Sequence, residues 1–170
     1  MNKLKRAPDC RSYYALWLKF KRIDQYLLWF SNEKDGIWVN EKGMVPVWEN
    51  TKDLQCFTQK IGIKLEDEKP KCHDLDKVAA FLNKESWGIT PNEVLEAWNL
   101  FIDLGNSVKD QAFIAKDKES FELYNEIFRL SGLLNTAKPS SSLTFLDANC
   151  QAKLREILSM GFNLFEKYLL

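Results

Sequence analysis

Histidine is almost absent from this chain of 170 residues, which contains a single one, His73. Zinc sites built on paired histidines and HExxH metalloproteases each need two. Glycine is also scarce, with seven residues, and neither GxGxxG nor GxxxxGK[ST] occurs. The catalytic contexts GxSxG, SxxK and CGxC are missing as well. The sequence therefore predicts no metal, no nucleotide cofactor and no recognisable nucleophile.

Long apolar runs are lacking too. No segment reaches the roughly 18 to 20 consecutive apolar residues of a membrane span. The basic N-terminus has no uninterrupted apolar stretch behind it, so it does not resemble a signal peptide. The four cysteines include no CxxC pair and are too sparse for a disulfide framework. These absences predict a reduced, cytoplasmic protein in which Cys56 and Cys150 are small core residues on helices.

What the chain does have is a large apolar share and a balanced charge. Apolar residues make up 45%, six of the residues are tryptophan, and 24 basic side chains oppose 24 acidic ones. The zero balance argues against binding nucleic acid by bulk charge. It hides a basic, aromatic segment over residues 1–24 and an acidic excess over residues 85–126. We expect the N-terminal aromatics to pack on the core, and we predict neither nucleic-acid nor membrane binding.

The N-terminal half reads as a small sheet with short helices. Residues 9–22 fit both a helix stripe and a strand, and we prefer the helix. Three β-rich runs follow at 25–30, 37–39 and 44–48, separated by turns that end in glycine, which predicts an antiparallel meander. Asn50 or Thr51 can cap a helix that runs to residue 60, and Asp74 can cap another.

The C-terminal half reads as three longer helices. The first begins at a capping box of Thr90 and Glu93, with Pro91 in the first turn, and should extend to about residue 115. The others span about residues 118–130 and 145–168, with a Pro/Ser loop over 135–142 between them. Strands followed by helices predict an α+β fold. We expect a single domain over 1–170, with possible lobes at 1–84 and 88–170.

His73 is the first candidate site. It follows Cys72 and lies close in sequence to Asp74 and Asp76. The spacing matches no metal motif, and we favour a histidine on a surface loop. The alternative is a small enzyme or ligand-binding domain with a site between the sheet and the helices, in which His73 acts with Asp74 or Asp76.

Acidic residues form the other candidate sites. The helix that starts at Thr90 repeats carboxylates at seven-residue intervals, which return to nearly the same face. A solvated face is the default interpretation, but a face of one sign with few bases would also meet a basic partner quickly and selectively. A charged loop forms a second patch. The predicted partner-binding residues are Glu93, Glu96, Asp103 and Asp110 on the helix, with Glu66, Asp67 and Glu68 on the loop.

One segment carries a family resemblance. Residues 98–108, Trp-Asn-Leu-Phe-Ile-Asp-Leu-Gly-Asn-Ser-Val, resemble a segment of bacterial immunity proteins from polymorphic-toxin and contact-dependent growth inhibition systems. Residues 36–48 and 74–78 are similar too. The resemblance implies a cytoplasmic, non-enzymatic protein that binds a secreted toxin domain, often a nuclease. The acidic residues fit this independently, because a nuclease is commonly basic where it grips phosphate. An intracellular regulator or scaffold remains a third alternative, and the oligomeric state is open.

Overall fold

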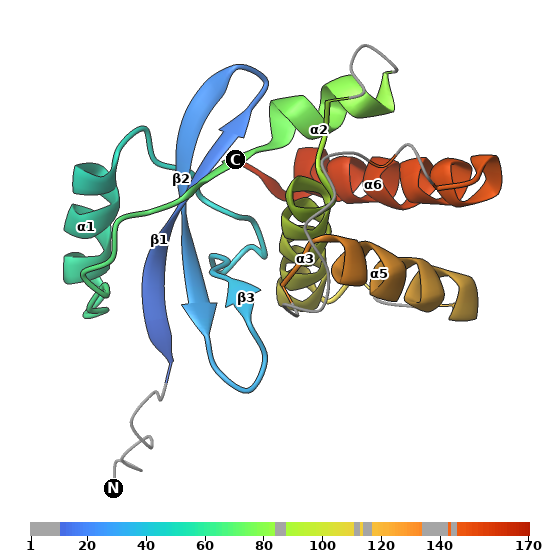
Figure 1. Ribbon diagram of the computed structural model, residues 1–170. Helices are drawn as coiled ribbons and strands as arrows, with labels where there is room; N and C mark the ends of the chain where they lie inside the picture. The colour runs from blue at the N-terminus through green and yellow to red at the C-terminus, as the bar shows by residue number, and fades with distance from the viewer. Residues whose placement is uncertain (1–10, 84–87, 111–112, 114–116, 134–142, 144–145) are drawn as a thin grey trace, which may run out of the picture.

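The computed structural model describes residues 11–83, 88–110, 113, 117–133, 143 and 146–170. The described strands form one sheet in the order β3-β2-β1-β4 (Figure 1). β1 (Ser12–Phe20) and β2 (Ile23–Ser31) are a long antiparallel hairpin, flanked by the short strands β3 (Gly36–Ile37) and β4 (Cys72–Asp74). β4 runs parallel to β1 and β3 runs antiparallel to β2. With the helices, this sheet confirms the predicted α+β class.

Residues 12–20 form a strand, so the helix predicted for 9–22 is wrong over this range. Both faces of β1 are covered, with Leu18 and Phe20 in the cluster under the helices and Tyr13 in the cluster under α1. A strand buried on both faces loses its clean alternation of polar and apolar residues. The turn at Lys21 and Arg22 has a positive φ at both residues, yet it lacks the Asn-Gly signature of such hairpins.

The predicted meander is confirmed at β2 and β3, but its last member is not a strand. Over 44–48 only isolated bridges form, from Val45 to Leu169 and from Trp48 to Tyr26. The segment predicted as a charged loop, residues 66–73, in turn contributes its last two residues to β4.

The helices begin where their capping residues predicted. The side chains of Asn50, Asp74 and Thr90 accept hydrogen bonds from the first turns of α1 (Thr51–Lys60), α2 (Leu75–Leu82) and α3 (Pro91–Val108). Thr90 and Glu93 form the complete capping box. α3 ends earlier than predicted, at a left-handed Lys109. α5 (Lys118–Leu130) matches its prediction, and α6 (Ala148–Tyr168) begins after Asp147, while residue 145 and the 135–142 loop lie outside the described residues.

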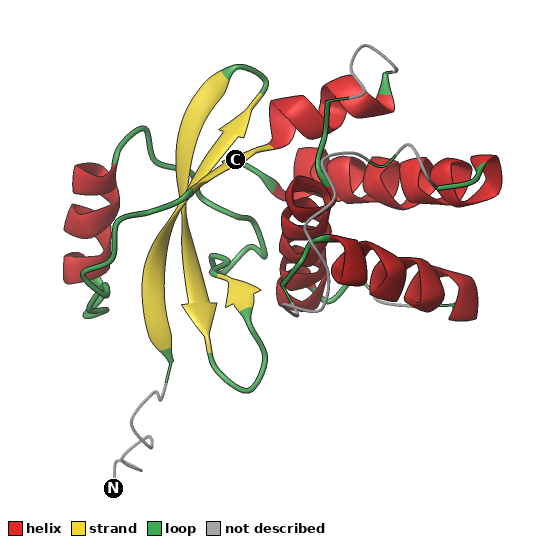
Figure 2. Cartoon of the chain, in the orientation of Figure 1, coloured by secondary structure: helices red, strands yellow, loops and turns green. Residues whose placement is uncertain are grey.

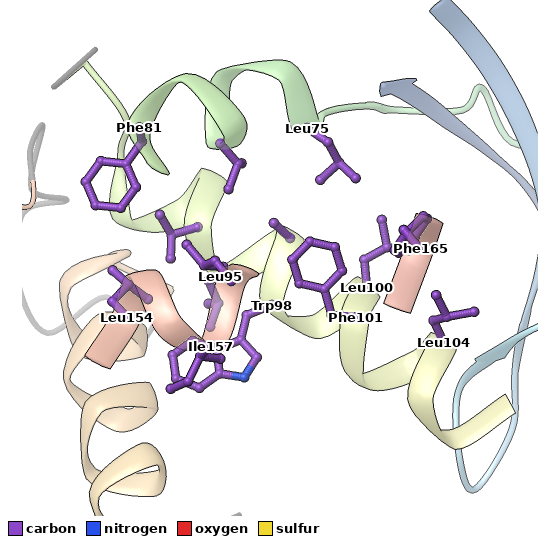
Figure 3. Packing of buried hydrophobic residues seen from close by; sticks show 14 of the residues in the cluster. Leu75, Phe81, Leu95, Trp98, Leu100, Phe101, Leu104, Leu154, Ile157 and Phe165 are labelled. Carbon is purple, nitrogen blue, oxygen red and sulfur yellow. The ribbon is translucent and has the colours of Figure 1, made fainter. Parts of the chain in front are cut away.

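Helices cover both faces of the sheet (Figure 2). Among the described helices, α1 packs on one face, around Leu54 and Phe57, and α2, α3, α5 and α6 lie on the other. The larger hydrophobic cluster includes residues from both predicted lobes, for example Leu27 in β2 and Phe101 in α3. Figure 3 shows its helical part, where Trp98 and Phe101 of α3 meet Ile157 and Phe165 of α6. Cys56 is exposed, so its prediction as a core residue is wrong, and Cys150 is half-buried.

A candidate binding cleft between the sheet and helix α3

The acidic residues of α3 face other parts of the protein. Glu93 completes the capping box and pairs with Lys77, whose Nζ lies 3.0 Å from Oε1 of Glu93. Glu96 pairs with Lys71 and accepts a hydrogen bond from Asn92 at 2.7 Å.

The next two positions of the seven-residue repeat have partners as well. Asp103 accepts a hydrogen bond from the indole N–H of Trp29 at 2.9 Å, and Asp110 lies 3.3 Å from Nζ of Lys167. The expectation of an open acidic face with few bases is therefore wrong. The neutralising lysines come from α2, α6 and the 66–71 segment, which a count of charges along one stretch of sequence does not include.

A cleft of about 700 Å³ opens between the helix-facing side of the sheet and α3. Its floor is the part of that face that α3 and α6 leave uncovered, with the side chains of Tyr14, Leu16 and Trp29. One wall is α3 and the other is the segment that leads into β4. The remaining lining residues are Ala15, Ser31, Asp35, Glu68, Lys69, Pro70, Lys71, His73, Glu96, Asn99, Leu100 and Asp103.

Three of the predicted partner-binding residues meet at this cleft. Glu68 comes from the loop patch, and Glu96 and Asp103 come from the helix patch. Glu93 borders an adjoining hollow of about 400 Å³ that also reaches Glu96. The other predicted residues do not line it: Glu66 and Asp67 are exposed on the same loop, and Asp110 lies two residues beyond the C-terminal end of α3.

His73 is a residue of strand β4, so the prediction of a histidine on a surface loop is wrong. Only 22% of its side chain is exposed, and within the described residues its buried Nδ1 has no hydrogen-bond partner. The closest carboxylate oxygen is Oε2 of Glu96, at 3.9 Å, which is beyond hydrogen-bond distance. Burial lowers the pKa of His73, while Glu96 opposes that shift. The lowered pKa favours the neutral form of the imidazole.

Among the carboxylates that line the cleft, that of Asp103 has the most strongly shifted pKa. Burial raises its pKa to about 6, and the nearby carboxylate of Asp35 acts in the same direction. The hydrogen bond from Trp29 opposes both by stabilising the charged form. A partly buried carboxylate with a raised pKa lowers the stability of the folded protein when it is charged. Such groups are typical of functional sites.

Two aromatic rings also line the cleft. Tyr14 and Trp29 lie side by side with centroids 5.4 Å apart and planes tilted by 50°. Their π faces and the neighbouring carboxylates both attract positive charge. Four carboxylates and two lysines line the cleft, so its balance is negative with a neutral His73. The arrangement is suited to a cationic group.

Sequence reasoning missed the sheet residues of this site. Tyr14 lay in the segment predicted as a helix, and Trp29 and Asp35 lay in a predicted strand and turn with no motif to single them out. In the sequence, these sheet residues are marked only by the high aromatic content of their segments. A hydrophobic core explains that content equally well.

No family model, curated protein or solved structure matches the chain. Within the described ranges, no three His, Cys, Asp or Glu side chains gather as metal ligands. In the same part of the chain, none of the helices combines the length and the apolar character that crossing a membrane requires.

Proposed function

We propose that this chain is an immunity-type binding protein: it neutralises the domain of a secreted toxin, and the acidic cleft is the centre of the interface. The observation that carries the proposal is the meeting of two acidic patches that are distant in sequence. Glu68 from the loop lies along the same cleft as Glu96 and Asp103 from α3. A partner that is basic in its active site, such as a nuclease, would find carboxylates on two sides of a single cleft.

The ion pairs already present fit such a role. Lys71, which pairs with Glu96, is 66% exposed at its side chain and belongs to an exposed loop. A basic side chain of the partner can replace it without burying a new unpaired charge. The rim carboxylates Glu66 and Asp67 would mainly accelerate encounter, while groups buried in the cleft would slow dissociation. An interface of this kind buries on the order of 1,200–2,000 Å².

This proposal includes a cytoplasmic location and no catalysis, cofactor or nucleic-acid ligand. The geometry of the cleft favours binding over catalysis. His73 and Glu96 are too far apart to be hydrogen-bonded as an acid–base pair, and no Ser, Cys or Thr with a recognisable nucleophile context lines the cleft.

The proposal predicts that a toxin domain is encoded beside the gene for this chain, and the test uses that domain as the partner. Glu68→Gln, Glu96→Gln and Asp103→Asn are combined, and association is measured by biolayer interferometry at low and high salt. We expect the association rate at low salt to fall about tenfold or more, with a weaker salt dependence. Glu119→Gln, Glu122→Gln and Glu156→Gln remove the same charge from exposed sites on α5 and α6 and should leave binding unchanged. Equal binding by both triple variants would overturn the proposal.

One observation favours a second function, a small-ligand or enzymatic site. The cleft reaches His73, and the buried Nδ1 of that residue is free to accept or donate a hydrogen bond to a ligand. A thermal-shift screen of small organic cations against the parent and His73→Gln would test it. A compound that stabilises the parent and not the variant supports this function, and a screen without any such compound rejects it.

A further inference from the structure

An open stretch of strand edge borders the cleft. The chain that ends in β4 pairs with β1 at two places, Tyr13 with Leu65 and Trp17 with Cys72. Between these points β1 advances by four residues while the other segment advances by seven. Residues 66–71 therefore leave the edge of β1 and return to it, and among the described residues no strand pairs with the edge between the two contacts.

Ala15 is the residue whose main chain faces this gap. The carbonyl of Tyr13 accepts a hydrogen bond from the N–H of Glu66, so the backbone groups of Tyr13 point outward. Backbone direction alternates along a strand, so the N–H and C=O of Ala15 also point outward, away from β2. In the described part of the chain, neither group of Ala15 is hydrogen-bonded to the 66–71 segment.

The side chain of Ala15 belongs to the cluster on the α1 side of the sheet, so its main chain is what borders the cleft. An unpaired N–H and C=O on a strand edge is the template for adding an extended segment of another chain. A residue opposite Ala15 would place its own side chain on the α1 side. Its two neighbours would then project into the cleft, beside Tyr14, Leu16 and the carboxylates of α3.

We propose that the cleft receives a short extended segment of the partner, which pairs its main chain with Ala15 and inserts a neighbouring basic side chain into the cleft beside Trp29 and the carboxylates Glu96 and Asp103. This inference rests on the proposed function and specifies how the partner docks. The pairing fixes the register of the segment, and the acidic, aromatic cleft selects the side chain next to the paired residue.

The probe is the peptide acetyl-Thr-Thr-Arg-amide, whose β-branched residues favour an extended backbone and whose three residues, about 10 Å long, match the three positions between Tyr13 and Trp17. Amide hydrogen exchange of the parent protein is followed by NMR with and without the peptide. We expect the Ala15 amide to exchange at least about tenfold more slowly with the peptide bound. The amides of Tyr14 and Leu16, which face β2, should not change. A peptide with Glu in place of Arg should give no protection.

Ala15→Pro removes the outward N–H while leaving the bonds to β2 intact, a position at which an edge strand tolerates proline. We expect it to weaken peptide binding about tenfold, whereas Ala15→Ser retains the N–H and should bind like the parent. If Ala15→Pro does not fold, exchange in the parent still decides. Peptide binding without Ala15 protection, or no binding at about 5 mM peptide, overturns this inference.

The two proposals fail in distinguishable ways. A toxin domain that depends on Glu68, Glu96 and Asp103 but leaves Ala15 exchange unchanged rejects the strand pairing alone. A toxin domain that binds the charge-removed triple variant as it binds the parent rejects the proposed function itself.

Discussion

At the scale of single residues, the buried carboxylate of Asp103 lines the cleft and lowers the stability of the folded protein. Its carboxylate is mostly buried, and in the described part of the chain the indole N–H of Trp29 is the hydrogen-bond donor that stabilises it. An aspartate in an unfolded chain has a pKa near 3.9, whereas burial raises that of Asp103 to about 6 in the folded protein. The folded state therefore binds a proton more tightly than the unfolded state.

The first prediction concerns the pH dependence of stability at this residue. Because the folded pKa is raised, stability is lost as pH rises from about 4 to 6, and the deficit persists above 6. Asp103→Asn keeps an acceptor for Trp29 and removes the charge. We expect it to be more stable than the parent by about 1–2 kcal/mol at pH 8, with this difference falling to about a third at pH 4.5. Urea unfolding at both pH values measures this.

The exposed Glu122→Gln is the control for removing one negative charge, and its stability difference should not vary in this way. A constant difference between Asp103→Asn and the parent across the pH range would show that Asp103 titrates normally.

A second prediction at the residue scale concerns the hairpin turn. Arg22 has φ +62° and Lys21 has φ +53°, a conformation that costs a residue with a side chain about 1–2 kcal/mol. Glycine avoids this cost, but it also makes the unfolded chain more flexible, which offsets part of the benefit. We therefore expect Arg22→Gly to raise the free energy of unfolding by about 0.5–1 kcal/mol. Lys34→Gly, at an exposed residue whose φ is not positive, should give no gain. Thermal unfolding compares them, and equal changes would contradict the explanation.

At the scale of elements, the crossing of α3 and α6 sets the position of the cleft wall. Gly161 of α6 lies directly against the buried ring of Phe101 in α3, and a Cβ there would come within 2.0 Å of that ring. Phe20 of β1 stacks on the same group of rings through Phe162 and Phe165. The distance between sheet and helices thus depends on a residue without a side chain.

Gly161→Ala should destabilise the protein by about 2–3 kcal/mol or more, because the fully buried Phe101 ring has no free space into which it can move. Met160→Ala, at the half-exposed neighbouring position, controls for the change in helix propensity and should have a small effect. Adding Phe101→Leu should recover part of the loss, since the two positions are in contact and couple. Chemical denaturation measures five proteins: the parent, the single variants Gly161→Ala, Phe101→Leu and Met160→Ala, and the double variant. Additive effects would contradict the proposed contact.

At the scale of the whole molecule, local chemistry was predictable from sequence and long-range assembly was not. The starts of α1, α2 and α3 follow from capping residues that act within three positions of themselves. β1 was mistaken for a helix because both of its faces are buried. β4 was missed because its three residues become a strand only by pairing with β1, more than fifty residues earlier.

The candidate site, like the fold, has a part that was predictable from the sequence and a part that was not. The acidic residues were visible as a charge pattern, and three of them do meet at the cleft. Their partners were not visible, because Trp29 reaches Asp103 across 74 positions and Lys167 reaches Asp110 across 57. Whether a carboxylate faces solvent or a neighbouring element depends on the tertiary arrangement, which the spacing along one helix does not specify.

The residues that line the cleft are far apart in the sequence, and this separation affects the order in which the protein folds. The β1–β2 hairpin joins neighbouring residues and belongs to a class of structure that forms within microseconds. The cleft needs residues near 14–35, 66–73 and 96–103 in place together, and each of these meetings closes a long loop. During refolding, the cleft should therefore form after most of the β-sheet signal has appeared, so that only chains whose refolding is complete present the proposed binding surface.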